Sequence, residues 1–170
     1  MGRTKFMNNS NDKTSYGMKK EVKNLEELRA VAEGFLNTIA KNPLKETAIV
    51  IGLSGDLGAG KTAFVKCVAS ILGITEVVTS PTFILEKVYI IPRGSILGER
   101  FTKLIHVDAY RLEGGKEMRA LDWDALLLDE HNLIFIEWPE QVKEAMPKDI
   151  INLSFEYAGE GVRQITGDLI

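Results

Sequence analysis

The stretch GDLGAGKT, residues 55–62, decides how the rest of the chain is interpreted. It fits the pattern G-x-x-x-x-G-K-[ST] of a phosphate-binding P-loop. The apolar run TAIVIGL (47–53) precedes it and is typical of a strand that is buried on both faces. The segment TAFVKCVASILG (62–73) follows it and is typical of a helix that ends at a glycine. The motif therefore lies between a strand and a helix, which is the context a P-loop requires.

The residue types of this loop explain how it would hold a nucleotide. Glycines let the backbone adopt conformations closed to other residues, and successive N–H groups form an anion-binding nest at a helix N-terminus. Lys61 would reach the β- and γ-phosphates, and the Thr62 hydroxyl would bind Mg²⁺. The predicted binding residues are Gly55, Asp56, Leu57, Gly58, Ala59, Gly60, Lys61, Thr62 and Ala63.

A P-loop also needs an acidic side chain near the metal, at the end of a neighbouring strand. Asp108 ends the run LIHVD, and Glu137 ends the more continuous run LIFIE. Both would emerge at the carboxyl edge of the sheet, where α/β proteins bind ligands. Glu137 fits the metal-holding role better, which leaves Asp108 to order an attacking or metal-bound water.

We therefore predict Lys61, Asp108 and Glu137 as catalytic residues, with Thr62 and Glu137 as the metal ligands. A strand-end carboxylate can also cap the next helix, so each acid has an alternative structural interpretation. Spacing alone does not divide the two roles between the acids.

The remaining segments predict one α/β domain. Apolar residues recur with helical spacing from Leu25 to Ile39, and Asn24 begins that helix in a capping-box arrangement. One or two helices are expected over 115–129, with a break near Leu121–Asp122. The alternating segment 149–165 turns at AGEG and predicts a terminal β-hairpin. The expected fold is a mostly parallel central sheet flanked by helices, with an antiparallel C-terminal β-hairpin.

Length and composition limit the classes of function that the chain can have. A chain of 170 residues suggests a single domain, which we place at 19–170 after a flexible polar tail at 1–18. The net charge of −3 does not favour direct, high-affinity binding of nucleic acid. The single cysteine, Cys67, fits a reducing cytosol, and no apolar run reaches the length of a membrane span. A cytoplasmic protein without membrane contact is therefore expected.

Several other polar side chains have two possible roles. The turn TSPT (79–82) contains the hydroxyls of Ser80 and Thr82, which could contact a γ-phosphate as switch loops do, although a simple hydroxyl-rich turn is the alternative. His106 is expected to be a satisfied structural histidine. Trp138 follows Glu137 and could pack in the core, stack, or anchor a partner.

Four motifs together resemble the bacterial TsaE (YjeE) family of small P-loop ATPases. They are GDLGAGKT, SPTF, HVDAYRL and FIEWPE, in this order and at this spacing, and the resemblance runs from about residue 20 to 157. It implies a P-loop NTPase domain with ATP and Mg²⁺ as cofactors. It also implies ATP hydrolysis that supports threonylcarbamoylation of adenosine 37 in tRNAs reading codons that begin with A.

The resemblance further implies partners and roles for single residues. The partners would be a threonylcarbamoyltransferase of the Kae1-like kind and its non-catalytic paralogue, a heterodimer, with tRNA reached only through that complex. The family's switch-like motif falls on Ser80, Pro81 and Thr82. Its other two motifs fall on His106, Asp108, Tyr110 and Arg111, and on Glu137, Trp138 and Pro139. Many relatives have a second threonine where this chain has Ala63.

Three other functions are compatible with a P-loop. A small-molecule kinase would use the same P-loop but normally adds an arginine-rich lid, and the mid-chain basic pair here is Arg100 and Lys103. A GTPase would need the guanine motif N-K-x-D, which the sequence lacks. A non-catalytic, nucleotide-dependent binding module would share the fold, so fold alone does not choose among these functions.

Overall fold

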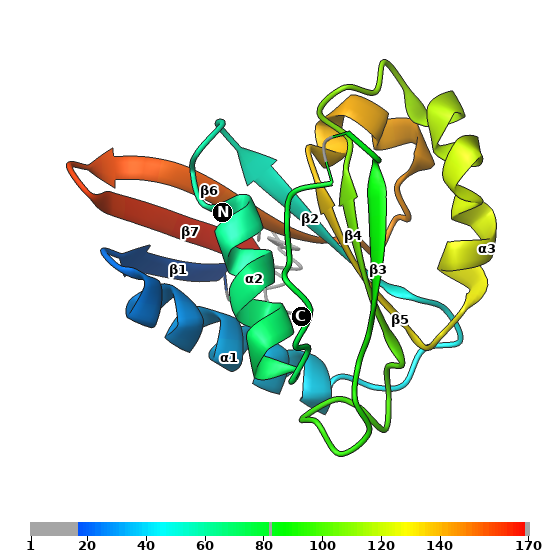
Figure 1. The fold of residues 1–170 in the computed structure, drawn as a ribbon. Coiled ribbons are helices and arrows are strands. Elements are labelled where there is room, and N and C mark those ends of the chain that lie inside the picture. Colours follow the sequence, from blue (N-terminus) through cyan, green and yellow to red (C-terminus); the bar gives the residue numbers. More distant parts are fainter. Residues whose placement is uncertain (1–16, 82, 169–170) are drawn as a thin grey trace, which may run out of the picture.

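The computed structural model describes residues 17–81 and 83–168. Its centre is a seven-stranded sheet, in which the strands lie in the order β1-β7-β6-β2-β5-β4-β3 (Figure 1). Their bounds are Gly17–Val22 for β1, Ile49–Gly55 for β2, Glu86–Ile90 for β3, Lys103–Asp108 for β4, Asn132–Glu137 for β5, Ile151–Gly159 for β6 and Val162–Asp168 for β7.

The sheet is mixed, so the prediction of a mostly parallel sheet was wrong. Strand β2 pairs in parallel with β5 and β6, and β4 pairs in parallel with β5. The pairs β1–β7, β6–β7 and β3–β4 are antiparallel. Strands β3 and β4 are joined without a helix, and a connection of this kind produces antiparallel neighbours because parallel strands need a longer crossover. The predicted C-terminal hairpin is confirmed as β6–β7.

Strand β1 was not predicted, and because it begins at Gly17 the folded domain starts before the predicted end of the tail at residue 18. Gly17 and Met18 were assigned to the tail, yet both belong to β1, and Met18 and Val22 are buried in the core. The pattern gave no signal because only two of the six residues in this edge strand are buried. The rest of the predicted tail, residues 1–16, lies outside the described residues.

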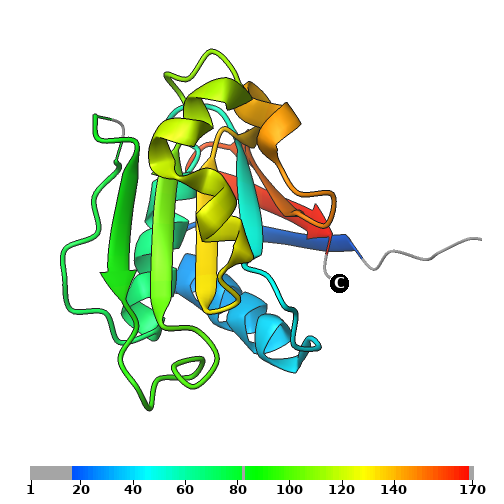
Figure 2. The ribbon, with the colours of Figure 1, turned by 90° about the vertical axis from the view of Figure 1, so that its right-hand side faces the viewer.

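Helices cover both faces of the sheet, as Figures 1 and 2 show. Helices α1 (Leu25–Lys41) and α2 (Lys61–Ile71) contribute to the larger core cluster on one face. The 3-10 helices η1 (Gly115–Leu121) and η2 (Pro139–Ala145), together with α3 (Trp123–Leu128), enclose the smaller cluster on the other face. Within the described residues, no helix is both long and apolar enough to cross a membrane.

The predicted helix boundaries are confirmed by their caps. The Asn24 side chain accepts a hydrogen bond from the Glu27 backbone N–H at 2.9 Å, which satisfies one of the free donors of the first turn of α1. Gly73 follows the end of α2 with φ of +77°, a left-handed conformation that suits glycine. Asp122, with φ of +54°, separates η1 from α3 at the predicted break.

Three parallel strands bring the candidate site together at one edge of the sheet. Strand β2 ends at Gly55, the first residue of the P-loop, while β4 and β5 end at the two predicted acids. In the sheet register Glu137 lies beside Leu53 on one side and beside Asp108 on the other. Residues separated by more than 50 positions in the sequence therefore meet at this edge because the strands are parallel and in register.

Candidate nucleotide-binding site

The P-loop connects β2 to α2 through glycines whose backbone conformations other residues rarely adopt. Gly55 has φ of +132°, and a Cβ atom there would lie 2.1 Å from the carbonyl oxygen of Phe155. Gly58 and Gly60 also have positive φ angles, +78° and +112°. Gly60 is the N-cap of α2, so the free N–H groups of the first helical turn point into the loop. This is the backbone arrangement that binds phosphate.

Lys61 begins α2, and its side chain is buried beneath the loop. Its Nζ atom donates hydrogen bonds to the carbonyl oxygens of Gly55, at 2.5 Å, and Asp56, at 2.9 Å. The same atom lies 4.0 Å from the centre of the Trp138 ring. Burial lowers the pKa of Lys61, and the negative charge of Glu137 is foremost among those that partly offset this effect. The lysine therefore lies under the loop with carboxylates around it.

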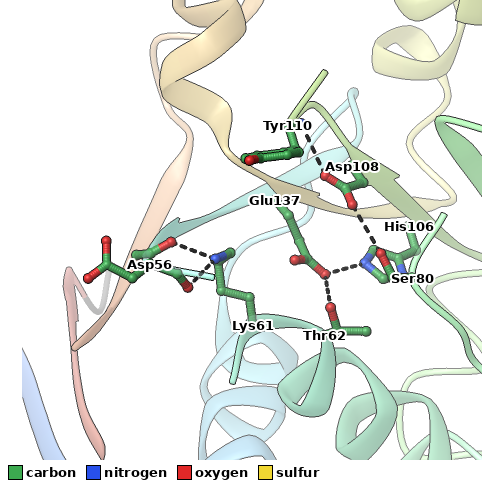
Figure 3. A network of polar contacts seen from close by, with 9 residues as sticks. Asp56, Lys61, Thr62, Ser80, His106, Asp108, Tyr110 and Glu137 are labelled. Carbon is green, nitrogen blue, oxygen red and sulfur yellow. Dashed lines mark hydrogen bonds and ion pairs between the residues drawn. The ribbon is translucent and has the colours of Figure 1, made fainter. Parts of the chain in front are cut away.

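Thr62 and Glu137 form the pair expected of metal ligands. Thr62 Oγ1 donates a hydrogen bond of 2.6 Å to Glu137 Oε1, as Figure 3 shows. The proton of the hydroxyl points at the carboxylate, so the oxygen lone pairs of Thr62 are available to a cation. Hydroxyl and carboxylate oxygens are hard ligands of the kind that Mg²⁺ takes, and Mg²⁺ completes its shell with water and substrate phosphates. The donor set fits Mg²⁺ bound to a nucleotide.

Asp108 lies beside this pair and is held by its own hydrogen bonds. Its Oδ2 atom accepts a hydrogen bond from Ser80 Oγ at 3.0 Å, and its Oδ1 atom accepts one from the Tyr110 backbone N–H at 3.1 Å. The carboxylate is buried, with 4% of its surface exposed. Ser80 thereby links the SPT segment to the end of β4.

A cavity of about 480 Å³ collects these groups. It is lined by Leu57, Gly58, Gly60, Lys61, Thr62, Ala63, Ser80, Asp108, Tyr110, Glu137 and Trp138. The cavity thus combines glycine backbone and a lysine, which suit the phosphates, with two neighbouring carboxylates, which suit the metal. Among the predicted binding residues, Ala59 is buried and Asp56 contributes its carbonyl oxygen to Lys61 instead of lining the cavity.

The remaining predicted residues have different positions. The Tyr110 and Trp138 rings pack at a tilt of 51° with centroids 5.1 Å apart, and the half-buried Trp138 also packs against the smaller core cluster. Arg111 lies outside the cavity lining, and its guanidinium lies 4.5 Å from the centre of the exposed Phe83 ring. Thr82 lies outside the described residues.

His106 was expected to be a satisfied structural histidine, and only one of its two ring nitrogens has a hydrogen-bond partner among the described residues. Its ring is fully buried, and Nε2 lies 2.9 Å from Glu137 Oε1, next to the Thr62 hydroxyl. Its Nδ1 atom has no hydrogen-bond partner among the described residues. The sequence did contain a signal, because His106 precedes Asp108 by two positions on a strand and therefore faces the same side of the sheet.

The basic pair considered for a kinase lid is engaged elsewhere. Arg100 donates hydrogen bonds to the carbonyl oxygens of Ile39, Asn42 and Pro43 at the end of α1. Lys103 forms an ion pair of 3.3 Å with Asp129. Neither side chain lines the cavity at the P-loop.

Comparison with known proteins identifies the family. A sequence model described as threonylcarbamoyl adenosine biosynthesis protein TsaE matches residues 22–165. The chain is 39% identical over 122 residues to the TsaE protein of Streptomyces coelicolor, covering 69% of this chain and 77% of that one. It is 36% identical over 129 residues to that of Treponema pallidum, covering 76% and 87%. Both relatives carry the name tRNA threonylcarbamoyladenosine biosynthesis protein TsaE.

A solved structure is similar to this chain in both fold and sequence. The crystal structure of YdiB from Bacillus subtilis superposes with a TM-score of 0.66 and 30% sequence identity, covering 91% of this chain and 86% of that one. Residues 22–165, which the family model matches, contain the P-loop, both predicted acids and most of the C-terminal hairpin. The chain is therefore a member of the TsaE family, the family of threonylcarbamoyl adenosine biosynthesis proteins.

Proposed function

We propose that this protein hydrolyses Mg-ATP and thereby acts as a nucleotide-driven switch in the threonylcarbamoylation of adenosine 37 in tRNA. The observation that carries the proposal is the short hydrogen bond from Thr62 Oγ1 to Glu137 Oε1, directly beneath a glycine loop that begins a helix. Family membership supports the tRNA-modification context. The proposed place of action is the cytoplasm, where tRNA is modified.

The P-loop would hold the phosphates with its backbone N–H groups. Lys61 would exchange the carbonyl oxygens of Gly55 and Asp56 for phosphate oxygens, and its partly desolvated charge would interact strongly with them. Thr62 and Glu137 would hold Mg²⁺, which supplies neutralisation of the phosphate charge during transfer.

Asp108 is suited to orient the attacking water. It is buried, it lies beside Glu137 in the sheet register, and two hydrogen bonds fix its carboxylate plane. A fixed carboxylate can accept a hydrogen bond from water and hold the water's oxygen toward the γ-phosphate. Its link to Ser80 would also make the SPT segment sensitive to whether a γ-phosphate is present.

The energy of hydrolysis would be used to change partners rather than to modify a small substrate. A switch loop that contacts the γ-phosphate is ordered before hydrolysis and released afterwards, and such a change has an effect only if a partner distinguishes the two states. The proposed partners are the Kae1-like threonylcarbamoyltransferase and its non-catalytic paralogue. With a net charge of −3, this chain would reach tRNA through that pair.

Phosphate release from ATP by the purified chain, alone and with the transferase pair, tests the proposal. We expect slow release that the pair stimulates strongly, without phosphate transfer to a small acceptor. Transfer to an acceptor would instead establish the kinase alternative, although the positions of Arg100 and Lys103 do not favour it. Flat, negligible release in both conditions would contradict an ATPase switch.

A variant of Glu137 distinguishes the ATPase switch from a non-catalytic binding module. Glu137→Ala should abolish stimulated release, whereas Glu156→Ala, which removes an exposed carboxylate from β6, should leave it unchanged. Unchanged release by the Glu137 variant would favour the binding module.

A further inference from the structure

A short contact joins His106 to Glu137, the proposed metal ligand at the end of β5. The imidazole lies on β4 with no exposed surface, and its Nε2 atom lies 2.9 Å from Glu137 Oε1. The same oxygen accepts the hydrogen bond from Thr62. We propose that His106 is a positioning residue that orients the Glu137 carboxylate toward Mg²⁺. This inference rests on the proposed function.

The surroundings of the imidazole select one tautomer. If Nε2 carries the proton, it donates to Glu137 Oε1 and leaves a bare lone pair at the buried Nδ1. In the other tautomer, the Nε2 lone pair would face a carboxylate oxygen at 2.9 Å, and a buried N–H at Nδ1 would lack an acceptor among the described residues. The Nε2–H tautomer is therefore assigned, with His106 as the donor.

Two donors on one carboxylate oxygen determine where the other oxygen points. Thr62 reaches Oε1 from helix α2, and His106 reaches it from strand β4, so two separate elements hold the group. From the part of the chain that the structure describes, no hydrogen bond reaches Oε2 of Glu137. Hydrogen bonds of this kind orient ligands and tune metal affinity at many metal sites.

Stability alone does not account for a histidine at this position. A buried nitrogen without a partner is unfavourable, and an apolar side chain of similar size would fill the same space without it. The neighbouring side chains on β4, Leu104 and Ile105, are apolar and fully buried. What His106 adds, and an apolar residue would not, is the N–H that reaches Glu137.

Nucleotide binding in the presence and absence of Mg²⁺ tests the inference. A fluorescent mant derivative of the non-hydrolysable analogue AMPPNP is titrated into the full chain, first in EDTA and then at increasing Mg²⁺. The variants are His106→Leu, which removes the donor, and His106→Gln, whose amide nitrogen occupies a place similar to Nε2. Ile105→Val is the control for packing, because it shortens a buried neighbour that faces the other core cluster.

We expect His106→Leu to raise the Mg²⁺ concentration for half-maximal enhancement of binding by about tenfold. Affinity in EDTA should be unchanged, and His106→Gln should restore most of the Mg²⁺ response. A structural role would instead lower the melting temperature and weaken binding equally with and without Mg²⁺. If His106→Leu does not fold, His106→Asn replaces it, because its shorter amide does not reach Glu137.

The outcomes separate this inference from the proposed function. A wild-type chain that binds the analogue without any Mg²⁺ dependence would overturn the proposed function, and the inference with it. A Mg²⁺-dependent wild type with unchanged dependence in both the leucine and asparagine variants would overturn only the inference. The same would follow if Ile105→Val shifted the Mg²⁺ dependence as far as His106→Leu does.

Discussion

Thr62 Oγ1 lies 2.6 Å from Glu137 Oε1, although 75 positions separate the two residues in the sequence. The contact joins the first turn of α2 to the end of β5, and so connects the phosphate-binding loop to the acidic edge of the sheet. Because the hydroxyl and the carboxylate meet there, the proposed Mg²⁺ site lies directly beside the proposed phosphate site.

Changing Thr62 should therefore separate a hydroxyl effect from a packing effect. Thr62→Ser retains the hydroxyl and should keep Mg²⁺-dependent phosphate release within about threefold, whereas Thr62→Val should reduce it by about 100-fold or more. Phosphate release measured against Mg²⁺ concentration checks both variants. Equal activity of the serine and valine variants would contradict the role of Thr62 as a metal ligand.

Lys61→Ala should abolish Mg-ATP binding or turnover, with a loss of release of about 100-fold or more. The reason is that Lys61 is the buried ammonium group next to the glycine loop, and among the residues that the structure describes no other lysine lines the cavity. Lys66→Ala removes the same charge from the exposed face of the same helix and should leave binding unchanged. Near-normal hydrolysis by Lys61→Ala would end the P-loop assignment.

Two N-terminal truncations should differ in stability. Removing residues 1–16 should change the melting temperature little, because the sequence of that segment has no apolar period. Removing residues 1–22 also deletes β1 and the buried Met18 and Val22, each of which contributes roughly 1.5–3 kcal/mol on burial. Thermal unfolding of both truncated chains checks this. A large loss on removing 1–16 would show that the core extends into that segment.

Arg100 should stabilise the fold without affecting nucleotide binding. Its guanidinium donates to three carbonyl oxygens at and beyond the C-terminal end of α1, where a cation also complements the helix dipole. We expect Arg100→Ala to lower the free energy of unfolding by about 1.5–3 kcal/mol. Urea denaturation measures the loss, with the exposed Arg93→Ala as the matched control. Equal stability of the two variants would contradict a stabilising role for these three hydrogen bonds.

Cys67 should be unreactive in the native protein. Burial raises the pKa of its thiol above the ordinary value of 9.0, and the charge of Arg29 offsets this only in part. Because the folded pKa is raised, the neutral thiol favours the folded state below pH 9.0, and this contribution is lost as the pH rises through the folded value. Ellman's reagent at pH 8 should react rapidly only after guanidinium unfolding. Rapid reaction in native buffer would contradict burial of the thiol.

Much of the site could be predicted because its signals are local. The P-loop, the helix that follows it and the two acids at strand ends depend on short patterns: a glycine spacing, an apolar run, and a charged residue where that run stops. The break at Asp122 and the cap at Asn24 were likewise visible in neighbouring residues. Each of these features is set by backbone conformation within a few residues.

The errors concern which strands pair and whether they run parallel or antiparallel, and a short stretch of sequence does not contain this information. The place of β1 beside β7 depends on residues at opposite ends of the chain, and the antiparallel pairing of β3 with β4 depends on how the connection between them folds. The guanidinium of Arg111 lies over the exposed Phe83 ring, outside the cavity lining, and its candidate role as a switch or partner residue stays a prediction.

The sequence by itself therefore determined the chemical groups of the site and the order of the elements that carry them. The tertiary structure decided which groups touch: Thr62 and His106 on one oxygen of Glu137, and Ser80 on Asp108. The physical reason is that backbone patterns act over a few residues, whereas a hydrogen bond between side chains requires strand register, sheet order and rotamers to agree across the whole domain.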